Sequence, residues 1–80
     1  MHELSLTLAL LDEVDTVVRR EGATRVTSVN VRVGRQSAIA CEALAFAWDV
    51  ARLGTIASAA DLCIEQVEGR AFDLVGLDVR

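Results

Sequence analysis

The sequence predicts a small α/β (α+β) domain with two helices packed on one face of a three-stranded mixed β-sheet, in the order α-β-α-β-β. Two observations favour this class. Apolar residues recur at three- and four-residue spacing in two stretches, and they follow strand-like patterns bounded by turn residues in three others. The chain has 80 residues, 52% hydrophobic and 25% charged, as is typical of one globular domain. We therefore expect residues 1–80 to form a single domain.

The first predicted element is an amphipathic helix from Glu3 to Glu21. Its apolar stripe, with spacings of three and four, consists of Leu4, Leu8, Leu11, Val14 and Val18, widened by Leu6, Leu10 and Val17. Gly22 follows the last turn, at the position where glycine commonly ends a helix.

A half-exposed strand is predicted next, from Arg25 to Val33. Its two faces alternate, with Thr27, Val29, Val31 and Val33 on one side and Val26, Ser28, Asn30 and Arg32 on the other. A loop over residues 34–37 leads to a second helix, from about Cys41 to Leu53. Its apolar side comprises Leu44, Ala47, Trp48 and Ala51. We expect the Trp48 ring to anchor the core rather than to form a binding platform.

Two further strands complete the chain. The segments Leu62 to Val67 and Ala71 to Val79 are strand-like, and Glu68-Gly69 between them is a candidate tight turn. The simplest prediction is a hairpin, with Val75, Leu77 and Val79 on one side of its second strand. A right-handed βαβ crossover would make the first two strands parallel and the third antiparallel to the second.

The composition excludes several classes of function. The net charge is −4, and no basic run or aromatic platform is present, so nucleic acid is not an expected partner. No run of 18 apolar residues and no signal peptide is visible, which favours a cytoplasmic protein with no membrane association. We expect Cys41 and Cys63 to be reduced and to act as small buried hydrophobes.

The first three residues, Met1, His2 and Glu3, carry a possible metal site. They offer four nitrogens to one ion: the α-amine, the His2 imidazole, and the backbone amides of His2 and Glu3. A square-planar nitrogen set suits Ni(II) and Cu(II), whereas zinc prefers a tetrahedral site. Because the first four N–H groups of a helix have no intrahelical acceptor, deprotonating two of them would break no helical hydrogen bond. The alternative is a frayed, solvated start.

Taken together, the sequence resembles the HypA family, the nickel-incorporation proteins that help mature nickel–iron hydrogenase and, in some bacteria, urease. The likeness runs along essentially the whole chain. It is carried by the opening residues 1–6, by Val29 to Gly34, Glu42 to Trp48, Gly54 to Ala57 and Ile64 to Val67, and by the closing residues 74–79.

The resemblance implies Ni(II) ligands from Met1, His2 and Glu3. It also implies partners, namely a nickel-handling GTPase and the hydrogenase large subunit. The family carries a zinc domain with two Cys-x-x-Cys pairs between its second and third strands. That insertion is absent here between about residues 68 and 73, so no zinc is expected.

The leading hypothesis is a nickel metallochaperone-like protein for hydrogenase maturation. The alternative is a zinc-less protein-interaction module with little or no metal delivery. An enzyme is not expected, because there is one histidine, no supported nucleophile–base pairing and no phosphate-binding loop.

Overall fold

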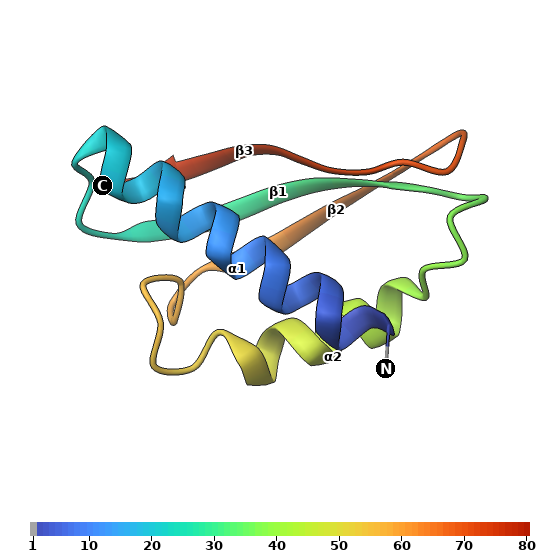
Figure 1. The fold of residues 1–80 in the computed structure, drawn as a ribbon, viewed down its shortest axis with the longest axis horizontal. Coiled ribbons are helices and arrows are strands. Elements are labelled where there is room, and N and C mark those ends of the chain that lie inside the picture. Colours follow the sequence, from blue (N-terminus) through green and yellow to red (C-terminus); the bar gives the residue numbers. More distant parts are fainter. Residues whose placement is uncertain (1) are drawn as a thin grey trace.

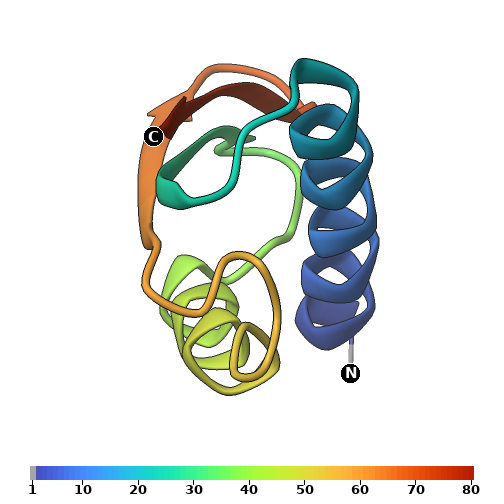
Figure 2. The same ribbon diagram turned by 90° about the vertical axis from the view of Figure 1, so that its left-hand side faces the viewer.

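The computed structural model describes residues 2–80 and contains the five expected elements in the expected order (Figure 1). They are α1 (His2–Glu21), β1 (Val26–Gly34), α2 (Cys41–Ala51), β2 (Asp61–Val67) and β3 (Phe72–Val79). Figure 2 shows both helices on the same side of the three-stranded mixed sheet. The predicted fold class is therefore confirmed. In the described part of the chain, no helix is both long and apolar enough to cross a membrane.

The strand order is β2-β1-β3, so the predicted hairpin is wrong. β1 pairs in parallel with β2, with Val31 opposite Ile64, and antiparallel with β3, with Val29 opposite Leu77. The reason lies in β1, whose buried valines are at most 1% exposed: Val26, Val29, Val31 and Val33. A strand with this many buried side chains is best placed in the centre of the sheet. Pairing β3 with β2 would have left β1 at an edge.

The connection from β2 to β3 crosses the end of β1 at Gly34. The Gly34 N–H donates to the Ala71 carbonyl at 2.7 Å, and the Gln36 N–H donates to the Gly69 carbonyl at 2.8 Å. A Cβ atom on Gly34 would lie 2.6 Å from the Gly69 carbonyl carbon and 2.8 Å from the Arg70 nitrogen. Glycine is required here because two backbones approach each other closely. The four residues of the connection, 68–71, can reach about 13 Å when extended. This length is enough to pass over one strand to its far side.

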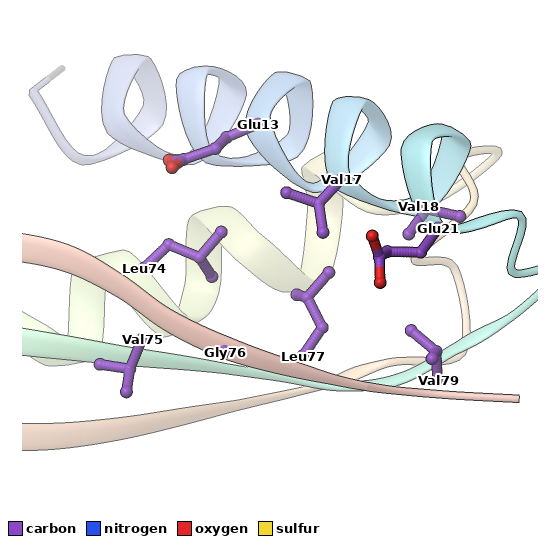
Figure 3. Close-up of a pocket in the computed structure, with 9 residues that line it drawn as sticks. All are labelled: Glu13, Val17, Val18, Glu21, Leu74, Val75, Gly76, Leu77 and Val79. Atoms are coloured by element: carbon purple, nitrogen blue, oxygen red, sulfur yellow. The ribbon is translucent and has the colours of Figure 1, made fainter.

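A β-bulge at Val75 changes which residues of β3 face the helices. The register shifts between Asn30 and Val31 of β1, so that Val75 is an extra residue on β3. Leu74, Leu77 and Val79 point towards α1, whereas Val75 points to the opposite side (Figure 3). The prediction that Val75 shares a face with Leu77 and Val79 is therefore wrong.

A second register shift, between Val26 and Ser28, corrects the predicted faces of β1. The sequence pattern placed Val26 on the other face of the strand from Val29, yet both side chains are fully buried. An extra residue in the strand moves every side chain before it to the other face of the sheet. Val29, Val31 and Val33, which follow the shift, alternate as predicted.

The core confirms the role expected for Trp48, which is 1% exposed and whose indole Nε1 donates to the Ala60 carbonyl at 3.1 Å. The two cysteines differ from each other. Cys41 is half-buried and packs against the core, whereas Cys63 is exposed, so its expected burial is wrong. Cys63 alternates along β2 with Leu62 and Ile64, whose side chains take the core-facing positions.

Candidate metal centre at the amino terminus

α1 begins at His2, one residue earlier than the sequence pattern predicts. The His2 side chain is exposed and Glu3 is half-buried. Met1, the third residue of the predicted site, lies outside the described residues. Because His2 and Glu3 occupy the first turn, their backbone N–H groups are among those that a helix leaves without an intrahelical acceptor.

The Glu3 carboxylate joins the start of α1 to the start of α2. Its Oε2 accepts a hydrogen bond at 3.1 Å from the backbone N–H of Ala40. Ala40 is the N-cap residue of α2 and has no side-chain cap bond of its own. The N–H of Ala40 and then the N–H of Glu3 itself hold the pKa of this carboxyl below its usual range, and nearby His2 lowers it further. A carboxylate is favoured at this place because helix amino termini are electropositive.

The Thr7 side chain is hydrogen-bonded to the backbone of Glu3. Its hydroxyl, which is 0% exposed, donates to the Glu3 carbonyl at 2.8 Å. Glu3 is thus fixed through its main chain by Thr7 and through its side chain by Ala40. The sequence pattern predicted neither partner. The threonine four residues after Glu3 could have indicated the first, because this back-bond is common in helices. No local signal could have indicated a contact across 37 positions.

Within residues 2–80, no group of three His, Cys, Asp or Glu side chains could hold a metal ion. The two cysteines do not approach such an arrangement. Cys41 Sγ accepts a hydrogen bond from Gln66 Nε2 at 3.4 Å, while Cys63 lies on an exposed strand position. The described side chains therefore form no metal-binding cage.

Comparison with known proteins relates this geometry to a family. Residues 1–72 match the family model described as "Hydrogenase/urease nickel incorporation, metallochaperone, hypA". The chain belongs to the HypA family. The match includes Met1, His2 and Glu3 and ends on the first residue of β3.

Two similar relatives are each named "Hydrogenase maturation factor HypA". The protein of Deinococcus radiodurans is 45% identical over 69 residues, covering 86% of this chain and 58% of the relative. That of Chlorobium limicola is 42% identical over 67 residues, covering 84% of this chain and 58% of the relative. This HypA-family chain thus spans somewhat more than half the length of these relatives.

A solved structure shares the fold. The solution structure of the nickel metallochaperone HypA from Helicobacter pylori superposes with a TM-score of 0.78, covering 92% of this chain and 70% of that one. The sequence identity is 17%, so this likeness establishes the shared fold of the two HypA chains and nothing finer.

Proposed function

We propose that this chain is a nickel metallochaperone that binds Ni(II) as cargo at Met1, His2 and Glu3 and delivers it for maturation of nickel–iron hydrogenase in the cytoplasm. It has no reaction of its own. Membership of a nickel-incorporation family supports the choice of metal. The observation that carries the proposal is the bond from Ala40 to Glu3, because it ties the metal-binding residues to the folded domain.

In the proposed site the α-amine of Met1, the His2 imidazole and the deprotonated amides of His2 and Glu3 surround the ion in a plane. Two amidates balance the charge of a divalent cation, so the electropositive helix terminus does not repel it. The Glu3 side chain is not a ligand in this arrangement. It holds the first turn in place while the Glu3 nitrogen binds the metal.

The proposal extends to composition and partners. Residues 1–80 act as a single nickel-binding domain, with the zinc insertion absent between about residues 68 and 73, and no zinc is bound. The partner that receives the nickel is a nickel-handling GTPase, the hydrogenase large subunit, or both in turn. The short connection between β2 and β3 supports a single domain without the zinc insertion, because the two strands are joined by a hydrogen-bonded crossing.

Calorimetric titration of Ni(II) into the chain with a free amino terminus tests the proposal. About one equivalent should bind at neutral pH, and binding should weaken in acid, because each ligand nitrogen must be free of its proton to bind the metal. The same chain acetylated on its α-amine should lose the site, as should His2→Ala. Cys41→Ser and Cys63→Ser are the controls and should bind as the parent does.

Equal nickel affinity in the free and acetylated chains would show that the α-amine is not a ligand. It would leave the protein-interaction module, without metal delivery, as the better description. Cu(II) should bind more tightly than Ni(II) in the same experiment, as the general affinity order of divalent metals requires.

A further inference from the structure

An apolar groove lies between α1 and β3, in the half of α1 that is remote from the amino terminus (Figure 3). Its volume is about 410 Å³. One wall of the groove is formed by α1, with Glu13, Val17 and Glu21. The other wall is formed by β3, with Leu74, Leu77 and Val79.

β3 presents unpaired backbone groups beside this groove. The carbonyls of Gly76 and Asp78 accept hydrogen bonds from the Asn30 and Thr27 side chains of β1, at 3.4 and 3.1 Å. The backbone groups of residues 76 and 78 therefore point towards β1. Because successive residues of a strand alternate, those of Leu77 and Val79 point the other way. β3 lies at the end of the sheet, so these groups face an open edge.

Two carboxylates stand on the α1 wall without a partner. Glu13, Val17 and Glu21 are spaced at i, i+4 and i+8, which places them in one row along the helix. No ion pair or hydrogen bond among residues 2–80 involves the side chain of Glu13 or Glu21. They lie about 12 Å apart along the helix axis, with an apolar residue between them.

We propose that this groove binds an extended segment of a partner protein, which adds to β3 as a fourth strand. Backbone hydrogen bonds form with Leu77 and Val79. Alternate side chains of one face of the added strand enter the groove, since side chains at i, i+2 and i+4 share a face. Residues i and i+4 of a strand are about 13 Å apart, which matches the spacing of Glu13 and Glu21. The recognised pattern is thus basic, any, apolar, any, basic.

Charge distinguishes this occupant from a second copy of the chain. The β3 strand of a second copy carries Asp73 and Asp78 and has no basic pair at the required spacing. Pairing two β3 edges would bring acidic strands together beside acidic helices, which is unfavourable. The proposal is independent of nickel binding, because no residue of the groove belongs to the proposed metal site.

The test is a titration of the ¹⁵N-labelled chain with a seven-residue peptide, blocked at both ends. It has arginine, valine and arginine at its second, fourth and sixth positions and threonine elsewhere. Amide shifts should gather at residues 13–21 and 74–79, and the affinity should fall with added salt. Glu13→Gln and Glu21→Gln should each weaken binding about two- to fivefold, the usual worth of an exposed ion pair. Glu42→Gln removes a carboxylate from α2 and should change nothing.

Two control peptides test the backbone and charge contributions separately. N-methylation of the central valine removes a strand donor and should reduce binding at least tenfold, and replacing both arginines by glutamate should abolish it. The proposal is overturned by shifts outside the groove, by equal effects of the Glu13, Glu21 and Glu42 variants, or by undiminished binding of the N-methylated peptide. Concentration-dependent broadening at residues 74–79 without peptide would also overturn it, in favour of a second copy.

Discussion

The carboxylate of Glu3, in the first turn of α1, accepts a hydrogen bond at 3.1 Å from the backbone N–H of Ala40, the residue that precedes α2. This contact connects two helix starts that are remote in sequence. Glu3→Ala removes the acceptor, so the Ala40 amide should exchange its hydrogen faster and the melting temperature should fall. Glu3→Asp is the control, because its shorter side chain keeps the charge but not the reach. Unchanged exchange at Ala40 in Glu3→Ala would contradict the role assigned to this bond.

The same contact predicts a dependence of stability on pH. The Ala40 N–H, first among several causes, lowers the pKa of the Glu3 carboxyl in the folded chain. The resulting stabilisation is present above the unfolded pKa, about 4.3, and is lost as the pH falls through the folded value. The melting temperature of the parent should therefore exceed that of Glu3→Gln at neutral pH, and the two should converge in acid. A constant difference across this range would show that the charge of Glu3 does not stabilise the fold.

Gly34 is predicted to tolerate no side chain. Its added Cβ would meet the backbone of Gly69 and Arg70, which cannot move aside as a flexible side chain could. Gly34→Ala should destabilise the domain by about 1–3 kcal/mol, the range for forced overpacking. Gly76→Ala is the matched control, because its Cβ would have no atom within 4 Å. Urea denaturation measures both, and equal midpoints would show that the crossing adjusts without cost.

Trp48 contributes both packing and a hydrogen bond. Trp48→Phe keeps an aromatic ring but leaves the buried Ala60 carbonyl without its indole donor. The expected loss is about 1–3 kcal/mol from the unpaired carbonyl alone. Phe46, on the same helix but 68% exposed, provides the control, and Phe46→Leu should change stability by less than about 0.5 kcal/mol. The denaturant midpoint should therefore fall more in Trp48→Phe than in Phe46→Leu.

Elemental analysis tests the expected absence of zinc. A closed zinc site needs four ligands, usually including thiolates, and this chain has two cysteines, one half-buried beside Gln66 and one on an exposed strand. The protein purified with a chelator should contain far less than one equivalent of zinc. If zinc remains at about one equivalent and Cys41→Ser removes it, the ligands come from a site shared between chains.

The elements themselves could be predicted because they depend on local patterns. The helical spacing of Leu11, Val14 and Val18 and the alternation of Val29, Val31 and Val33 each reflect the geometry of one segment. Leu4 and Leu8, which the predicted stripe also included, are exposed. The two bulges could not be predicted in this way. An extra residue at Val75 changes the facing of its neighbours without changing the sequence pattern, because a bulge arises from the register against a second strand.

The sequence by itself determined the five elements, the shared side of the helices and the four nitrogen donors of the proposed site, since these follow from periodicity and residue chemistry. Only the tertiary structure decided that the connection from β2 to β3 crosses β1 at Gly34, so that β3 pairs with β1. It also decided that Glu3 is hydrogen-bonded to Ala40 and that a groove opens beside Leu77. Each of these depends on the free energy of bringing distant segments together. The burial of Val26, Val29, Val31 and Val33 in the core outweighs the local preference of Glu68-Gly69 for a tight turn.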